Sequence, residues 1–454
     1  MVAKINRIDV VKKFKKPFLA FCMVAVFAFG AKAERSILTD DETETLLQNI
    51  VKPIFEVAGV AYDKNKIHLL NDMSLNAFVT DGNHLFVHTG TILKASNVNE
   101  ISGILAHETG HIAGGHVMRQ KLKINDLQTL SVISLLAAGA TAVASGRGDA
   151  AMAIALGSHG SMLNSMMAYQ TTEERNADES AVTYLKALNQ SPEGLKNFMK
   201  TIQQTNRLSG YEESPYFRTH PMSVERMSFF ETSAKQSGGK LTSPYDEDFA
   251  FVQAKLTAFL LPIEQVLRKY PSSTGSLQAK YAQAIVFLRQ KQFNKALTLA
   301  DELIAAKPQN PYFYQLKGQI LFESGKATQS AAVYEKALEI KPKSDEIMLA
   351  YAESALEAEN HQKNLQHIID VLTKLQHSRE NTHGWELLSK AYYEKGMKAD
   401  SMYALAKYSL ATDRFETAEK QIKEARTLNP SNALTIKLND LESELKKRQK
   451  DKQQ

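Results

Sequence analysis

The sequence predicts an α+β domain, mainly α with a small sheet, followed by an all-α solenoid of short helical repeats. Three observations predict this order. Apolar residues recur at helical spacing in 46–55 and 101–105, strand-like runs occupy 76–87, and after Tyr270 a pattern of small and large residues recurs every 34 residues. With 454 residues, the chain is longer than one hydrophobic core usually organises, so at least two domains are expected.

Residues 1–33 have the features of a cleaved signal peptide. A basic stretch precedes the apolar run Phe18–Gly30, and Ala31-Lys32-Ala33 supplies the small residues that signal peptidase requires. The apolar run is shorter than the roughly 20 residues that span a bilayer, which disfavours a retained anchor. A lipoprotein signal is disfavoured because the bulky Phe21 precedes Cys22. We therefore expect secretion, with cleavage before Glu34.

Removal of this segment changes the charge of the chain. The segment holds seven basic residues and one acid, so its loss leaves a formal net charge of −1 in place of +5. A nucleic-acid partner is therefore not expected. The single cysteine, Cys22, leaves as well, so the mature chain has neither a disulfide nor thiolate chemistry.

The first domain, expected over 34–265, begins with a helix whose apolar residues cover the core. A hairpin follows, with strands Asn76–Thr80 and Asn83–Val87 and the two-residue turn Asp81-Gly82. The first strand is an edge strand able to bind an extended peptide. Asn97 and Glu100 form a capping box, which predicts that the next helix begins there.

Residues 130–167 are rich in small residues, and the first part of this segment, 130–144, is nearly uncharged. A transmembrane hairpin is one interpretation. We favour a helical pair over the active site or against a membrane surface, because the run is short and is interrupted by Arg147 and Asp149. A peripheral membrane contact is thus one expectation.

The second domain, expected over 270–445, has the texture of tetratricopeptide repeats. Pro308 and Pro342 are 34 residues apart, and the same offset aligns further small and large residues: Ala284 with Gly318, Phe287 with Leu321, and Ala300 with Tyr334. At least three repeats are expected, stacked into a curved solenoid whose concave side binds partners. A plain helical bundle is the alternative. Residues 446–454 are expected to form a charged tail.

The chemistry is expected at His107-Glu108-Thr109-Gly110-His111. Histidines four apart project from one face of a helix, so His107 and His111 can both bind zinc. Glu108 flanks that face, where it can take a proton from water and pass it to a leaving amine. We expect one Zn²⁺ per chain.

A third ligand must come from elsewhere in the chain. Position 117 is valine, and His116 misses the required spacing by one residue, so it cannot point the same way on a helix. Glu174 is the best candidate, because it shares a helical face with Asp178, which can hydrogen-bond a ligand histidine. An acidic surface turn is the alternative reading of this segment.

These motifs together resemble a known family. The HExxH helix, the small-residue span, Glu174-x-x-x-Asp178 and Thr219-His220-Pro221 with Glu225-Arg226 are similar to the gluzincin peptidases of the HtpX and CAAX-protease group. The signal peptide and repeats narrow the resemblance to its periplasmic β-barrel assembly-enhancing branch. The resemblance implies an α+β zincin-like metallopeptidase domain followed by an all-α tetratricopeptide solenoid. It implies that the zinc ligands are His107, His111 and Glu174. It also implies that Glu108 is the base and that Asp178 hydrogen-bonds a ligand histidine.

The resemblance also implies partners and location. Substrates would be unfolded or misassembled outer-membrane proteins, the partner would be the β-barrel assembly machinery, and the location would be the periplasm. Any family role for a disulfide cannot operate, because the mature chain has no cysteine. The rival hypotheses are a tetratricopeptide chaperone or scaffold with a silent or structural zinc site, and a zinc esterase or amidase acting on cell-wall material.

His220 is the remaining candidate. Pro215 and Pro221 argue against a continuous helix around it, and a loop histidine usually has a surface or packing role. The resemblance places this loop beside the metal. There His220 would occupy the position that water needs and hold the enzyme latent, or would act as a transition-state donor.

Overall fold

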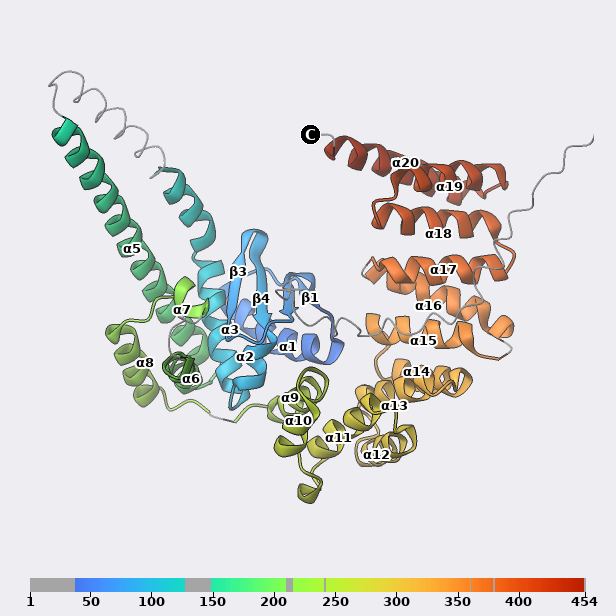
Figure 1. Ribbon diagram of the computed structural model, residues 1–454, viewed down its shortest axis with the longest axis horizontal. Helices are drawn as coiled ribbons and strands as arrows, with labels where there is room; N and C mark the ends of the chain where they lie inside the picture. The colour runs from blue at the N-terminus through green and yellow to red at the C-terminus, as the bar shows by residue number, and fades with distance from the viewer. Residues whose placement is uncertain are drawn as a thin grey trace, which may run out of the picture.

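The computed structural model describes residues 37–126, 148–209, 215–240, 242–359, 361–378 and 380–452. The expected signal peptide 1–33 and the segment 130–147 lie outside these residues. Residues 148–167 belong to a long helix, α5 (Gly148–Ala187), which projects from the first domain (Figure 1). None of the helices in the described ranges combines the length and the apolar character that a bilayer crossing needs.

A four-stranded sheet lies on one side of the first domain. Its order is β1-β2-β4-β3, with β2 parallel to β4 and the other neighbours antiparallel. The strands are β1 (Ile37–Leu38), β2 (Ile67–Leu70), β3 (Ala77–Thr80) and β4 (His84–His88). β3 lies at the edge of the sheet, as the sequence predicted for this segment.

The β3–β4 turn differs from the prediction. Thr80 pairs with His84, so the turn has three residues, Asp81–Asn83, and the predicted two-residue turn Asp81-Gly82 is wrong. Gly82 and Asn83 both have positive φ, 72° and 63°. Asparagine tolerates this left-handed conformation, so Asn83 serves as a turn residue and not as the first residue of a strand.

The helices of the first domain carry the candidate site. Besides α5, they are α1 (Asp41–Ala58), α2 (Thr89–Lys94), α3 (Val98–Ala113), α6 (Glu193–Ser209), α7 (Pro215–Thr219), α8 (Val224–Ser237) and α9 (Asp246–Leu260). α3 begins where predicted. The side chain of Asn97 accepts a hydrogen bond from Glu100 N, and Glu100 Oε2 accepts one from Ser96 N, both 3.2 Å.

α3 and α5 approach each other unusually closely because of Gly110. A Cβ built at Gly110 would lie 2.9 Å from the carbonyl oxygen of Ala177, so a larger residue would push the helices apart. Gly110 stands between the two motif histidines of α3, and Ala177 stands between Glu174 and Asp178 of α5. The glycine therefore brings the two predicted motifs together.

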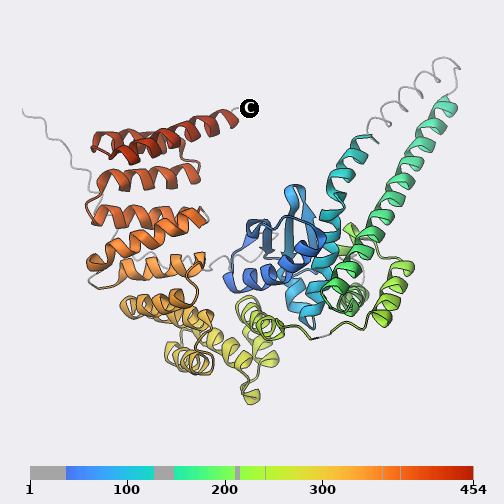
Figure 2. The ribbon, with the colours of Figure 1, turned by 180° about the vertical axis from the view of Figure 1, so that it is seen from behind.

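The second domain consists of helical pairs stacked into a curved column (Figures 1 and 2). After α10 (Ile263–Lys269), the helices are α11 (Leu277–Arg289), α12 (Phe293–Ala306), α13 (Pro311–Glu323), α14 (Ala327–Ile340), α15 (Asp345–Glu357), α16 (Leu365–Ser378), α17 (Thr382–Glu394), α18 (Lys398–Ala411), α19 (Phe415–Thr427) and α20 (Asn432–Asp451). A Cβ at Gly318 would lie 2.8 Å from the Tyr334 ring, which confirms the predicted nesting of small and large residues.

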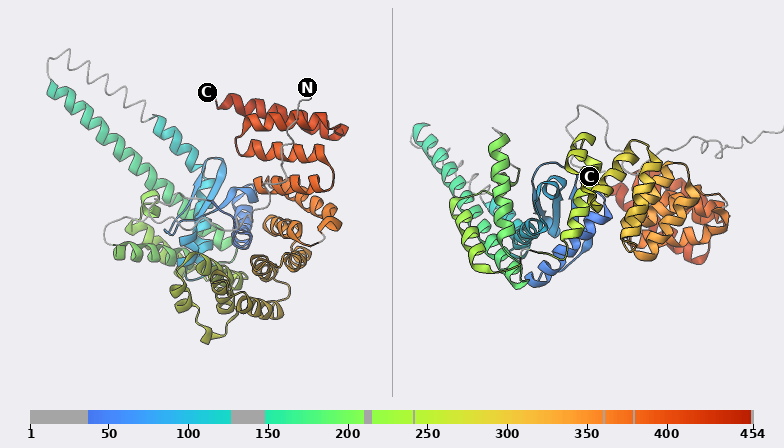
Figure 3. Two further views of the ribbon diagram at one scale, coloured as in Figure 1. Left: turned by 45° about the vertical axis from the view of Figure 1, so that its right-hand side comes forward. Right: turned by 90° about the horizontal axis from the view of Figure 1, so that it is seen from below.

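The two domains are joined through α9. Phe249, Val252 and Leu256 of α9 belong to the core of the first domain, whereas Phe251 and Ala254 pack with the first repeats. In the right-hand view of Figure 3, the yellow-green segment that includes α9 lies between the blue domain and the yellow and orange repeats. The expected boundary near 265–270 falls on α10, the helix after α9, whose Val266 packs with the first repeats.

Candidate active site

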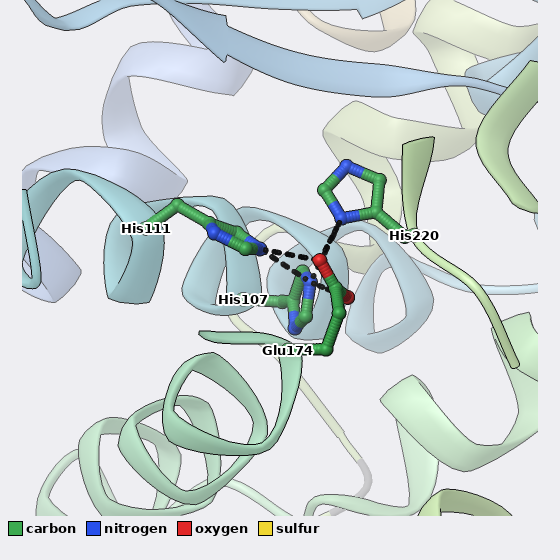
Figure 4. Close-up of side chains that lie close together, drawn as sticks. All are labelled: His107, His111, Glu174 and His220. Atoms are coloured by element: carbon green, nitrogen blue, oxygen red, sulfur yellow. Dashed lines mark hydrogen bonds and ion pairs between the residues drawn. The ribbon is translucent and has the colours of Figure 1, made fainter. Parts of the chain in front are cut away.

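The structure brings all six predicted site residues into one place. Nε2 of His111 lies 3.1 Å from Nε2 of His107, and these two nitrogens lie 3.4 Å from Oε1 and Oε2 of Glu174 respectively (Figure 4). His220 joins them, with its Nδ1 2.9 Å from Glu174 Oε1. One donor atom from each of these four buried residues lies within 4.8 Å of the others.

This donor set fits a metal ion. Three imidazole nitrogens and a carboxylate are ligands that suit zinc, and four of them can supply a tetrahedral site. Two imidazole nitrogens only 3.1 Å apart need a shared proton or cation between them. Both carboxylate oxygens of Glu108 are buried and accept no hydrogen bond from any described residue, so they remain available to a water molecule or a substrate.

Asp178 orients His107. Its Oδ1 lies 2.9 Å from His107 Nδ1, so the other ring nitrogen of His107 faces Glu174. A carboxylate this close to Nδ1 of a ligand histidine favours the tautomer with its proton on Nδ1 and helps to fix the ring orientation. The structure thus places Asp178 where the sequence interpretation required it.

Arg226 is a site residue that sequence reasoning missed. Its Nε and Nη2 donate to the two oxygens of Asp178 at 2.6 and 2.9 Å, and its Nη1 lies 3.0 Å from Glu174 Oε2. Nη1 also donates to Pro221 O at 2.6 Å. One buried guanidinium therefore connects the acidic residues of α5 with the turn that carries His220. Arg226 stood in a quoted motif, but its contact with Asp178 joins residues 48 positions apart, so no local pattern predicted it.

His220 follows directly after the short helix α7. α7 ends at Thr219, and residues 220–223, which include Pro221, are not helical. His220 N donates to Tyr216 O at 2.7 Å, and the two rings stack with centroids 4.6 Å apart. Nε2 of His220 lies 3.6 Å from Glu108 Oε1. The loop histidine is therefore buried and directed into the site.

Burial is the main cause of the pKa shifts of Glu108 and His111, whereas at His107 burial, which lowers the pKa, is outweighed by Asp178 and Glu174, which raise it to about 10. Burial raises the pKa of the Glu108 carboxyl, and the nearby His220 and His107 offset this effect only in part. It lowers the pKa of His111 to about 3, which favours the neutral imidazole that binds metals. A carboxylate with a raised pKa is suited to accept a proton from water and return it.

A pocket of about 350 Å³ opens beside these groups. Its lining combines the edge strand and the candidate site: Asn76, Phe78, Val79, Glu108, His111, His116, Val117, Gln120, Tyr169, Gln170, Glu173, Glu174, Arg218, Thr219 and His220. Two residues of β3, Phe78 and Val79, thus line the same pocket as Glu108.

Comparison with known proteins agrees with this site. Residues 41–234 match peptidase family M48, and residues 281–345 and 316–368 match tetratricopeptide repeats. The chain is 23% identical to the β-barrel assembly-enhancing protease of Yersinia pestis, over 75% of this chain and 70% of that protein. A putative β-barrel assembly-enhancing protease of Vibrio cholerae is 24% identical over 74% of this chain and 70% of its own. The β-barrel assembly-enhancing protease of Escherichia coli K12 is 21% identical over 76% of this chain and 70% of that protein.

The α+β fold with its helical repeats, the buried cluster and these similarities point to one class of enzyme. The chain is a metalloendopeptidase whose residues 41–234 match peptidase family M48 and whose residues 281–368 match tetratricopeptide repeats.

Proposed function

We propose that this chain is a periplasmic zinc endopeptidase that degrades misassembled outer-membrane β-barrel proteins and assists their assembly. The observation that carries the proposal is the buried group of His107, His111 and Glu174 beside the carboxylate of Glu108, which accepts no hydrogen bond from any described residue. The names of the relatives, β-barrel assembly-enhancing proteases, support the substrate class.

The chemistry follows from the donors and from Glu108. A zinc ion held by these donors would act as a Lewis acid toward the scissile carbonyl and lower the pKa of the attacking water. Glu108 accepts the proton of that water and delivers it to the leaving amine. Asp178 holds His107 in the tautomer that leaves Nε2 free to bind.

The edge strand supplies a place for the substrate. β3 pairs with β4 on one side, and no other described strand pairs with its second side. An extended peptide bound there by backbone hydrogen bonds would lie along the pocket that contains Glu108 and His111. Such binding selects unfolded segments, because a folded barrel does not offer a free strand.

His220 keeps the resting enzyme latent in this proposal. Its Nδ1 lies 2.9 Å from Glu174 Oε1 and 3.5 Å from His107 Nε2, where a fourth ligand would sit. A catalytic zinc site keeps one position open for water, so a fourth protein ligand there prevents the reaction. Movement of the turn after α7 would open that position.

The repeats bind the partner, for which we propose the β-barrel assembly machinery. The first repeats already contact the peptidase domain: Tyr281, Tyr312 and Glu346 each hydrogen-bond α1. We therefore expect the later helices, α17 to α20, to offer the partner surface.

The test is cleavage of an unfolded outer-membrane protein by the wild type and by Glu108→Gln. The amide has the same shape but cannot accept the proton, so we expect at least a 100-fold loss of cleavage with the metal content unchanged. Glu179→Gln is the matched control, because Glu179 is an exposed carboxylate of α5 paired with Arg175. Glu108→Gln with wild-type cleavage would refute the assignment of the base. If neither the wild type nor His220→Ala cleaves an unfolded protein, the result would favour the scaffold hypothesis.

A further inference from the structure

His111 makes a second contact on the side of its ring that faces away from Glu174. Its Nδ1 lies 2.8 Å from Nδ1 of His116. On the far side of that ring, Nε2 of His116 lies 2.6 Å from Oε2 of Glu173. The same oxygen accepts a hydrogen bond of 2.7 Å from Nη2 of Arg119. His111 is thus the first member of a chain of four polar side chains.

The end of α3 explains how His116 reaches this position. The helix ends at Ala113, two turn residues follow, with a φ of +65° at Gly115, and helical structure begins again at His116. A Cβ built at Gly114 would lie only 2.1 Å from Nε2 of His116. The imidazole therefore occupies the space that a side chain at Gly114 would fill. His116 is not one of the four clustered donors.

The protons of this chain can be assigned from its chemistry. If Nε2 of His111 binds a cation, its Nδ1 carries the proton and donates it to His116 Nδ1. His116 must then hold its own proton on Nε2, from which it donates to Glu173. The negative charge of Glu173 is matched by Arg119. Every donor meets an acceptor in this one arrangement.

His107 has a shorter chain of the same kind. Its Nδ1 contacts Asp178, and Asp178 is held by Arg226. Each motif histidine is therefore backed by a carboxylate and an arginine, and both carboxylates stand on α5 on either side of Glu174. The difference is that an imidazole stands between His111 and its carboxylate.

We propose that His116 is a positioning residue, which transmits the charge of Glu173 to His111 and aims Nε2 of His111 at the metal. The inference rests on the proposed metal site. Outer partners of this kind typically contribute 10- to 100-fold to metal affinity, because they fix the ring and raise its basicity.

The first measurement is the zinc dissociation constant of the full-length protein, by competition with a chromophoric chelator. We expect His116→Ala to raise this constant by about 10- to 100-fold and Glu173→Gln to raise it less. The matched control is His377→Ala, which removes an exposed histidine from α16 and should leave the constant unchanged. In the cobalt-substituted protein, His116→Ala should also shift the visible absorption bands, which a loss of packing alone would not do.

Gly114→Ala provides an independent test that removes no polar group. The φ of −72° at Gly114 accommodates alanine, so the substitution acts mainly by displacing the His116 ring. We expect it to weaken zinc binding as His116→Ala does, and the double variant to be no weaker than His116→Ala alone. If His116→Ala does not fold, as judged by circular dichroism of the metal-free protein, Gly114→Ala and Glu173→Gln decide the question.

The outcomes separate the two proposals. A wild type that binds no zinc refutes the proposed metal site and this inference together. A wild type that binds zinc, with unchanged affinity and cobalt spectrum in His116→Ala and Gly114→Ala, refutes only the role of His116. Additive losses in the double variant would show that Gly114 acts independently of His116 and would also overturn the inference.

Discussion

The hydroxyl of Tyr281, in the first repeat, donates a hydrogen bond of 2.9 Å to Oε2 of Glu42 in the peptidase domain. Lys255 of α9 completes this contact, because its Nζ lies 3.4 Å from the same oxygen and 2.5 Å from Oδ1 of Asp40. All four side chains are buried. The two domains are therefore joined by ionisable side chains that are buried away from solvent.

This junction predicts a pH dependence of stability. Burial is the main cause that raises the pKa of Glu42 from 4.5 to about 7, and Lys255 opposes it in part. Because the folded pKa is the higher one, the stabilisation due to the protonated carboxyl is complete below about pH 4.5 and is lost as the pH rises through 7. We expect Glu42→Gln to flatten this loss, so that its stability relative to wild type rises by up to about 3 kcal/mol between pH 5 and 8.

Denaturant unfolding of both proteins across that range measures the effect. Glu56→Gln is the control, because Glu56 lies exposed on the same helix. Parallel profiles for wild type and Glu42→Gln would contradict the prediction.

Arg226 predicts a large effect on stability. Its replacement by glutamine leaves the buried Asp178 and Glu174 without their cation, and loss of one partner of a buried ion pair costs about 3–5 kcal/mol. Arg226→Lys keeps the charge but cannot bond both oxygens of Asp178 and Pro221 O together, so we expect a smaller loss. Arg175→Gln, at an exposed pair on α5, should cost less than about 1 kcal/mol. An Arg226→Gln variant as stable as Arg175→Gln would show that the site tolerates uncompensated carboxylates.

The sequence predicted the parts of this site that depend on spacing within one helix. His107 with His111, and Glu174 with Asp178, are each four residues apart, and a helix places such pairs on one face. Tertiary contacts were not predictable in this way. His116 contacts His111 only because the helix ends at Ala113 and Gly114 lacks a side chain.

The same distinction holds for the fold. Small and large residues 34 apart predicted how Gly318 and Tyr334 nest, since each repeat contacts its neighbour in a regular way. The turn at Asp81–Asn83 was predicted one residue too short, because Asn83 can adopt either extended or left-handed backbone and the sequence alone does not distinguish them. The docking of α1 on the repeats depends on residues more than 200 positions apart, such as Glu42 and Tyr281.

We predict that removal of the metal lowers the stability of the folded protein and that added zinc restores it. Without a cation, the nitrogens of His107 and His111 and the carboxylate of Glu174 face each other in a buried space. A ligand that binds only the folded state at 1,000 times its dissociation constant stabilises it by about 4 kcal/mol. We expect a chelator to lower the melting temperature of wild type and zinc to restore it. Glu174→Ala should respond to neither, and a chelator response equal to that of wild type would exclude Glu174 as a ligand.

His220 gives the last prediction, which concerns latency. Its ring stacks on the ring of Tyr216. One of its nitrogens lies within 4.8 Å of a donor atom from each of His107, His111 and Glu174. Replacing His220 with alanine frees one position for water but leaves His107, His111 and Glu174 in place, and three protein ligands are sufficient for a catalytic zinc site.

We therefore expect His220→Ala to raise basal cleavage of an unfolded protein several-fold while the zinc content stays at one per chain. The measurement is initial cleavage rate together with metal analysis on the same preparation, and His377→Ala serves as the control. Cleavage abolished with the metal retained would instead make His220 a donor to the transition state, because such a donor is needed only during the reaction. An unchanged rate would leave His220 with a packing role against Tyr216.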